Sequence, residues 1–211
     1  MEETIYNTTA KQEKIGVLLG MLLGDAGLTT SNNIYYGHSI KQKEYALFKK
    51  QLLDNITGKD SHISYITQYG YDAIRVYPKT SDIIKETISL LYINRKKNIT
   101  KSVLDKVTLQ GLAIWFMDDG SCSVGKHNGI PNGGLKVTLN TYLTLENNQE
   151  LIEYFRDVWQ INWYNNYSKG KYRLGMGTKE SRKFFDLIKP YVIPEMQYKL
   201  KKSISELHGA S

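Results

Sequence analysis

The sequence contains a single cysteine, Cys122, among its 211 residues. One thiol cannot form an intrachain disulfide, and a cysteine-rich zinc site needs several, so both kinds of scaffold are excluded. The chain also lacks an apolar run of the roughly 20 residues that a membrane-spanning helix needs. Its first residues are acidic and polar, unlike the apolar centre of a secretory signal. These absences predict an intracellular protein that is not secreted and has no membrane partner.

Acidic residues are the minority among the charged side chains. The chain has 28 lysines and arginines against 21 aspartates and glutamates, a net charge of +7. Such an excess suits a polyanionic partner, either nucleic acid or an acidic membrane surface. The alternative at this stage is a soluble basic protein with no such partner. Hydrophobic residues make up 41% of the chain, which is typical of a globular protein with one large or two small domains.

Two apolar segments end abruptly in aspartate, "IGVLLGMLLGDA" at 15–26 and "LQGLAIWFMDDG" at 109–120. Residues 15–23 are apolar on every face, which predicts a helix buried on all sides. Three glycines recur every four residues along one face of this helix, Gly16, Gly20 and Gly24. Glycine weakens a helix, so this stripe predicts the close approach of a second helix. The helix near 112–117 is the natural partner.

The predicted elements around these two helices follow the same order twice. Each half is predicted as helix, two strands, helix, two strands, helix, with hairpins turning near Gly70 and Gly170 and a long turn at 121–134. We divide the chain into a first half at 1–94, a basic linker at 95–108 and a second half at 109–211. This is an α+β protein with internal duplication and pseudo-twofold symmetry, and Asp25 and Asp119 occupy matching places.

An aspartate at the C-terminal end of a helix is electrostatically unfavourable, and two such ends side by side repel each other. A divalent cation would relieve both effects, and carboxylate and carbonyl oxygens are the ligands that Mg2+ prefers. The predicted metal ligands are therefore Asp25 and Asp119, with Gly24 and Asp118 beside them. Magnesium at a phosphodiester would polarise the phosphorus and lower the pKa of an attacking water. The alternative, an ordinary aspartate–glycine turn, weakens when the feature occurs twice.

The two segments resemble the motif of the LAGLIDADG homing endonucleases, as "LLGMLLGDA" at 18–26 and "LAIWFMDDG" at 112–120. Two copies in one chain are similar to the monomeric, pseudosymmetric members, and the likeness extends over nearly the whole chain. The stretches "WFMDDG", "LIKPYVIP" and "YKL" are similar to intron-encoded mitochondrial members. The first motif departs from the family pattern at Gly24-Asp25-Ala26. The second helix lacks the glycine stripe, with Gln110, Ile114 and Asp118 at those offsets.

The resemblance implies two αββαββα repeats whose antiparallel sheets form a DNA-binding saddle. It also implies a monomeric nuclease that uses Mg2+, for which Mn2+ can substitute, to cut both strands of double-stranded DNA with short 3′ overhangs. The catalytic residues that it implies are Asp25, Asp119, Lys97 and Lys199, with Lys96 as the alternative to Lys97. The competing interpretation of these lysines is simple contact with the DNA backbone.

Alternation along the predicted strands separates side chains that face the core from those that face a duplex. Arg75, Arg173 and Asn140 are the predicted base readers, because arginine recognises guanine and asparagine recognises adenine in the major groove. For each of them the alternative is a phosphate contact or a solvated residue. The full predicted DNA-binding set is Tyr35, Ser39, Lys41, Arg75, Tyr77, Lys96, Lys136, Thr138, Asn140, Lys171, Arg173 and Lys201.

Two other functions share these features. An intron RNA maturase would bind its own intron RNA and assist splicing, and a DNA-binding regulator would bind without cutting. No protein-splicing segment is apparent, so we expect a free-standing, intron-encoded protein in an organelle or a bacterial cytoplasm. The histidines show no metal-ligand spacing and are predicted to be surface or partly buried residues: His38, His62, His127 and His208. Cys122 is interpreted as a packing residue.

Overall fold

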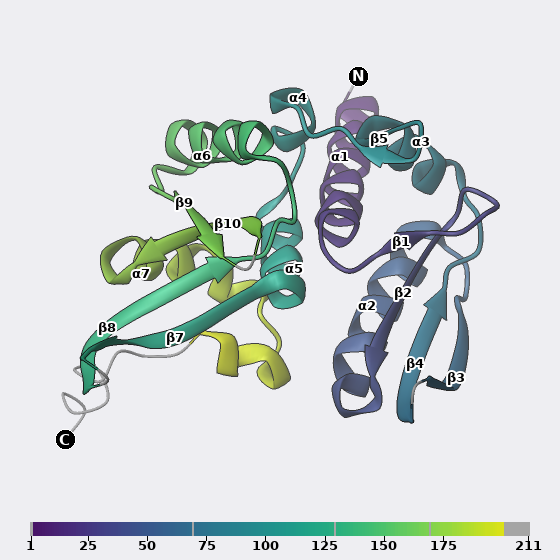
Figure 1. Cartoon of the computed structure of the whole chain (residues 1–211). Coiled ribbons are helices and arrows are strands. Elements are labelled where there is room, and N and C mark those ends of the chain that lie inside the picture. The colour runs from purple at the N-terminus through teal and green to yellow at the C-terminus, as the bar shows by residue number, and fades with distance from the viewer. Residues whose placement is uncertain (1, 69, 129, 169, 201–211) are drawn as a thin grey trace.

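The fold is built around a central pair of helices, α1 (Glu2–Leu23) and α5 (Leu109–Asp119), with an antiparallel sheet on each side (Figure 1). The structure is a computed structural model, and it describes residues 2–68, 70–128, 130–168 and 170–200. Lys201 and His208 therefore lie outside the described residues.

The first half runs through helix, sheet and helix elements in the predicted order. After α1 come β1 (Gly27–Leu28), β2 (Ile34–Ser39), a 3-10 turn (Ile40–Gln42), α2 (Lys43–Thr57), β3 (His62–Gln68), β4 (Tyr71–Tyr77) and α3 (Asp82–Leu91). The strands form one sheet in the order β1-β2-β4-β3. Gly70 has a φ of 77° at the β3–β4 turn, as the predicted hairpin requires.

The second half repeats this plan after α5. Its elements are β7 (Gly120–His127), β8 (Ile130–Leu139), α6 (Leu145–Trp159), β9 (Tyr164–Ser168), β10 (Lys171–Gly177) and α7 (Thr178–Ile188). The 3-10 turns Lys189–Tyr191 and Pro194–Lys199 follow. The strand order, β7-β8-β10-β9, matches that of the first sheet. The α+β class and the repeated αββαββα order are confirmed.

The prediction of a long turn at 121–134 was wrong. Most of these residues belong to β7 and β8, which pair from Gly120 opposite Leu139 to His127 opposite Ile130, with one irregularity between Val124 and Lys126. The glycine and asparagine content favoured a turn, but strand pairing and packing decide such segments more strongly than local preference does. The result is a long hairpin in the second half.

The glycine stripe of α1 lies against α5, as predicted. A methyl group at Gly20 would collide with the backbone of Gly111, and one at Gly16 would collide with Lys106 and Thr108. The partner helix α5 therefore contributes a small residue of its own, Gly111. This glycine lies one residue after Gln110, which occupies the place of Gly16 when the two motifs are aligned on their aspartates. This contact brings the two helix backbones close together.

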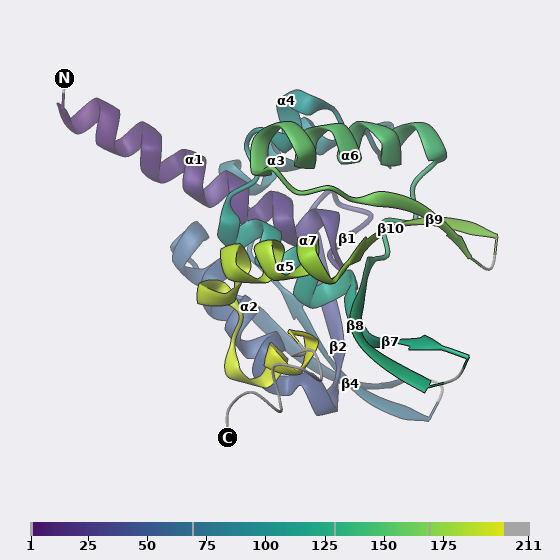
Figure 2. The ribbon, with the colours of Figure 1, turned by 90° about the vertical axis from the view of Figure 1, so that its left-hand side faces the viewer.

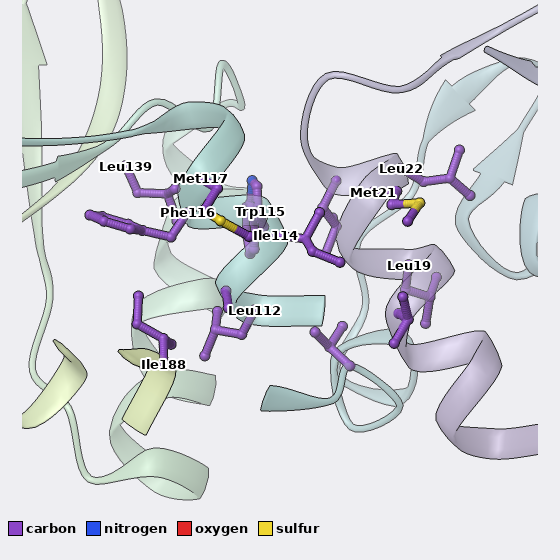
Figure 3. Close-up of a cluster of buried hydrophobic side chains, with 14 of the residues drawn as sticks. Leu19, Met21, Leu22, Leu112, Ile114, Trp115, Phe116, Met117, Leu139 and Ile188 are labelled. Atoms are coloured by element: carbon purple, nitrogen blue, oxygen red, sulfur yellow. The ribbon is translucent and has the colours of Figure 1, made fainter. Parts of the chain in front are cut away.

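Apolar side chains of both helices fill the space around this contact (Figure 3). In α5 every residue from Gly111 to Met117 is buried, which accounts for its apolar sequence. The labelled cluster joins α1 to α5, β8 and α7 through Leu19, Met21, Leu22, Leu112, Ile114, Trp115, Phe116, Met117, Leu139 and Ile188. The ends of α1 and α5 are thus fixed relative to each other by a continuous core.

The basic segment after α3 is more structured than a linker. Tyr92–Ile93 (β5) and Lys96–Lys97 (β6) form a hairpin, and α4 (Lys101–Leu104) follows. Asn94 and Arg95 at its turn have φ values of 50° and 62°, the pattern of a tight two-residue hairpin turn. The Arg95 guanidinium donates to the side chain of Asn32 and to the carbonyl of Thr29, each at 3.0 Å. Arg95 therefore anchors the hairpin to the first half.

The strand ends of both sheets that lie next to the hairpin turns project from the side of the molecule opposite the N-terminal end of α1 (Figure 2). The C-terminal ends of α1 and α5 lie between the two sheets (Figure 1). In the described parts of the chain, no helix combines the length and the apolar character that crossing a bilayer requires.

Candidate active site

Asp25 and Asp119 both lie at the C-terminal ends of the central helices. Asp119 is the last residue of α5, and Asp25 follows α1 by two residues. Both line one cleft between the two halves, together with Lys97 of β6 and Tyr142 before α6. The core that fixes the two helices therefore brings the two predicted metal ligands to one site.

The two carboxylates destabilise each other's ionised form. Burial, which is the largest cause, and the charges of Asp25 and Asp118 together raise the pKa of Asp119 to about 7. Burial and the charge of Asp118 also raise the pKa of Asp25, although its side chain is still 43% exposed. Negative charge therefore accumulates at a site that solvent can reach. A bound cation would relieve this repulsion.

The two predicted lysines occupy equivalent places at the two helix ends. Lys97 donates to the carbonyl of Leu23 at 3.0 Å, and Lys199 donates to the carbonyls of Met117 and Asp118. Each ammonium thereby satisfies terminal carbonyls of its helix. Burial lowers the pKa of both lysines, while the nearby aspartates oppose this shift. Lys96 also lines the cleft but is exposed, whereas Lys97 is half-buried and holds the end of α1.

Asp118 has a different environment from Asp119. Its carboxylate accepts two hydrogen bonds from the Lys49 ammonium, each at 2.9 Å, and one from the Tyr45 hydroxyl at 2.7 Å. It also accepts the backbone N–H of Asp25 at 3.1 Å. The side chains of Asp118 and Lys49 are fully buried. The predicted metal ligand Asp118 is thus already paired with a cation of the protein itself.

Gly24 leaves the space that Asp118 needs. A methyl group at Gly24 would collide with the Asp118 side chain. The two motifs differ at the residue before the predicted metal-binding aspartate, which is Gly24 in the first and Asp118 in the second. These two residues are complementary in size at the helix contact.

His38 contradicts the prediction that the histidines are surface or partly buried residues. It is 6% exposed, and its Nε2 lies 3.3 Å from the Lys49 ammonium. Burial and the charge of Lys49 lower the pKa of His38 to about 3, so the ring is neutral. Its Nδ1 lies 4.0 Å from Oδ2 of Asp25. The prediction holds for His62, which is exposed.

Asp25, His38 and Asp118 each present a possible ligand atom, all within 4.8 Å of one another. The Lys49 ammonium already supplies the positive charge at this cluster. The carboxylates of Asp25 and Asp119 are hard oxygen donors that line one cleft, and the pKa of Asp119 stays raised there although Lys97 and Lys199 oppose the shift. The residues of the cleft therefore fit Mg2+ better than the histidine cluster does.

The predicted DNA-binding residues are distributed over both sheets. Ser39, Lys41, Lys136 and Lys171 are exposed, and the others on the strands are half-buried: Tyr35, Arg75, Tyr77, Thr138, Asn140 and Arg173. In β8 the residues that alternate with the predicted DNA-binding residues are buried, as the strand pattern predicts. These are Leu135, Val137 and Leu139, which face the core. Tyr172 of β10 is half-buried, with its ring centroid 4.9 Å from that of Tyr167.

Several of these residues also have partners within the protein. The side-chain amide of Asn140 donates to the carbonyl of Asp119 at 2.9 Å, so this residue holds the end of α5. The Thr138 and Ser121 hydroxyls are hydrogen-bonded at 2.6 Å. Tyr35 stacks on Tyr77 with 6.0 Å between the ring centroids.

Sequence reasoning missed Lys49 and Tyr45, and it discounted His38. A signal was present in each case. Lys49 lies on the buried face of α2 with Tyr45 and Leu53, where a lysine is unusual unless it is paired. His38 belongs to the inward-facing set of β2, since Ile34 and Tyr36 are buried and the residues between are not. No pattern pointed to Asp118 as the partner of Lys49.

Comparison with known proteins identifies a family and a fold. The model of the LAGLIDADG DNA endonuclease family matches residues 15–184. Among solved structures, the homing endonuclease I-WcaI bound to its DNA recognition sequence superposes with a TM-score of 0.76 at 23% identity. That superposition covers 92% of this chain and 88% of I-WcaI, and it shows a shared fold.

Curated relatives fall into several classes. A RecA protein of Mycolicibacterium flavescens is 28% identical over 201 residues, which are 89% of this chain and 46% of the relative. The cytochrome b mRNA maturase bI2 of Debaryomyces hansenii is 27% identical over 209 residues, 92% of this chain and 76% of the relative. A probable intron-encoded endonuclease of Wickerhamomyces canadensis is 35% identical over 115 residues, 51% of this chain and 46% of the relative. The chain spans about half the length of the RecA relative.

Proposed function

Because the chain belongs to the LAGLIDADG DNA endonuclease family, we propose that it is a site-specific endonuclease that hydrolyses both strands of double-stranded DNA with Mg2+. The observation that carries the proposal is the meeting of Asp25 and Asp119 in one cleft, at the ends of two helices fixed by a common core. Two half-sites related by pseudosymmetry suit a duplex, whose two strands are also related by a twofold axis.

Asp25 and Asp119 would hold the metal through their carboxylates, with the carbonyl of Gly24 nearby. Bound Mg2+ would polarise the scissile phosphate and lower the pKa of the attacking water. Mn2+ can substitute for Mg2+ in this role. Lys97 and Lys199 already hold the ends of the helices, and their ammonium groups supply positive charge beside the phosphate. The water adds to phosphorus, and one phosphorus–oxygen ester bond breaks. We propose that the products carry short 3′ overhangs.

The two sheets would contact the DNA on either side of this cleft. Arg75 and Arg173 lie in β4 and β10, which hold equivalent places in the two sheets. We assign them to base contacts in the major groove, and the exposed lysines Lys136 and Lys171 to backbone contacts. I-WcaI, which has the same fold, is bound to its DNA recognition sequence. The protein acts as a monomer in the compartment that holds its target, an organelle or a bacterial cytoplasm.

The test is cleavage of a randomised double-stranded DNA library in Mg2+ or Ca2+, followed by sequencing of the cut ends. We expect one long enriched site that is cut in Mg2+ but not in Ca2+. Asp25→Asn and Asp119→Asn should each abolish double-strand cutting and retain DNA binding. A folded protein that binds DNA but leaves the library intact would overturn the proposal, and so would aspartate variants that still cut.

A second function, assistance in intron RNA splicing, has support from one relative. The cytochrome b mRNA maturase of Debaryomyces hansenii aligns with 92% of this chain. Binding to intron RNA that persists at high salt, together with faster splicing of that RNA, would establish a maturase. It would not require Asp25 or Asp119, so aspartate variants distinguish the two activities.

A further inference from the structure

We propose that His38 is a positioning residue that orients the carboxylate of Asp25, and that it supports one half of the active site more than the other. The inference rests on the proposed nuclease function and deepens it. His38 lies at the end of β2, with its ring buried between Tyr45, 4.9 Å away, and Tyr36, 5.7 Å away. The imidazole also has a hydrogen bond with the Gln42 side chain, besides its contacts with Lys49 and Asp25.

The contact with Lys49 fixes the direction of the ring. An ammonium group has only donors, so Nε2 of His38 must accept the hydrogen bond across the 3.3 Å separation. The ring hydrogen of the neutral imidazole is then on Nδ1, which faces Oδ2 of Asp25 at 4.0 Å. A small movement of the partly exposed Asp25 side chain brings these two atoms into hydrogen-bonding distance.

The same buried cluster also fixes the backbone of Asp25. The Asp118 carboxylate that pairs with Lys49 accepts the N–H of Asp25 at 3.1 Å. Asp25 is therefore approached twice, at its amide by Asp118 and at its carboxylate by His38. Groups that orient a ligand in this way typically change metal affinity or activity by 10–100-fold when they are removed.

The second half has a different residue at the matching position. Gly27 and Ser121 each lie two residues after the aspartate of their half, and they pair with Tyr35 and Thr138. Three residues beyond these partners lie His38 and Thr141.

Thr141 donates to the side chain of Asn148 at 2.6 Å, a neutral contact, whereas His38 contacts the charged Lys49. Asp119 is held instead at its carbonyl by Asn140. The orienting histidine is thus specific to the Asp25 half, and its loss should slow the cutting of one strand more than the other.

Two substitutions separate the role of Nδ1 from that of ring volume. The amide nitrogen of asparagine can occupy the place of Nδ1, whereas that of glutamine reaches the place of Nε2. We therefore expect His38→Gln to lose orientation of Asp25 and His38→Asn to retain most of it. On a supercoiled plasmid with one target site, His38→Gln should accumulate nicked circles, with the second cut slowed about 10-fold or more. His38→Asn should convert the plasmid to linear DNA at close to the wild-type rate.

A second measurement does not depend on cleavage. Titration of Ca2+ into the protein–DNA complex by calorimetry should show about 10-fold weaker binding for His38→Gln and little change for His38→Asn. Ser61→Ala is the folding control, because Ser61 is buried and its hydroxyl donates to Asp54 in the same half. It should lower stability without changing the ratio of nicked to linear DNA.

The outcomes distinguish this inference from the function on which it rests. A wild-type protein that does not cut would overturn the proposed function. A wild-type protein that cuts, with both His38 variants giving the wild-type ratio and the wild-type Ca2+ affinity, would overturn the role of His38 alone. If His38→Gln slowed the cutting of both strands equally, and Ser61→Ala did the same, His38 would only stabilise the fold.

Discussion

The Lys49 ammonium lies 2.9 Å from both carboxylate oxygens of Asp118, and this ion pair joins α2 of the first half to α5 of the second. Both side chains are fully buried. The Tyr45 hydroxyl, also from α2, donates to the same carboxylate at 2.7 Å. The Asp118 carboxylate therefore holds the two halves together and also fixes the end of α5 that borders the cleft.

Lys49→Met should destabilise the protein strongly, because it leaves the Asp118 carboxylate buried without its cation. Breaking a buried ion pair from one side costs about 3–5 kcal/mol. Urea unfolding of the metal-free protein measures this loss. Lys43→Met, at the exposed start of the same helix, should change the free energy of unfolding by about 0.5 kcal/mol or less. Equal effects of the two substitutions would contradict the importance of the buried pair.

Gly20→Ala should also weaken the protein, for a steric reason. The added methyl group would collide with the backbone of Gly111 across the helix contact, so α1 and α5 would have to separate. Overpacking of this kind costs about 1–3 kcal/mol and shifts the two aspartates relative to each other. Gly177→Ala is the control, because a methyl group there has open space. A Gly20→Ala protein with wild-type stability would show that the helix contact can relax.

Much of the fold could be predicted because its signals are local. Alternation in the strands, capping by Thr144 and the glycine stripe of α1 each depend on a few neighbouring residues. The doubled order of elements then predicted the paired halves. The hairpin at 120–139 was missed because its pairing depends on residues up to 19 positions apart that local composition describes as a turn.

The site was predictable where the two halves repeat each other and was not predictable where they differ. Asp25 and Asp119 stand out because the same feature occurs twice. Lys49 and Asp118 are 69 residues apart, and nothing near either residue identifies the other. His38 could have been placed on the inward face of β2, but its contact with Lys49 depends on how α2 packs on that strand.

The stability of the metal-free protein should depend on pH through Asp119. Burial, which is the largest cause, and the charges of Asp25 and Asp118 together raise its folded-state pKa from an ordinary value of 3.8 to about 7. The folded state therefore binds a proton more tightly than the unfolded state. The associated stability is fully present below about pH 4 and is lost as the pH rises through about 7.

Unfolding in urea at pH 5 and pH 8 tests this dependence. Asp119→Asn should gain stability relative to the wild type at pH 8 and less at pH 5, because asparagine carries no charge at either pH. Mg2+ should stabilise the wild type more at pH 8, since protons compete with the metal at the lower pH. A difference between Asp119→Asn and the wild type that is the same at both pH values would contradict the raised pKa.

Arg75→Ala and Arg173→Ala should each relax the choice of base at a single position of the target. Arg75 pairs with Gly37 across β2 and β4, and its aliphatic part lies over that glycine. A guanidinium that contacts guanine with two hydrogen bonds discriminates against other bases by about 1–3 kcal/mol. Binding to every single-base variant of the site, measured in Ca2+, gives the discrimination at each position.

Lys136→Ala should instead weaken binding to all variants of the site alike. It should also reduce the dependence of binding on salt, as loss of a phosphate contact does. If Arg75→Ala or Arg173→Ala behaves like Lys136→Ala, that arginine contacts the backbone and the bases are read by other residues.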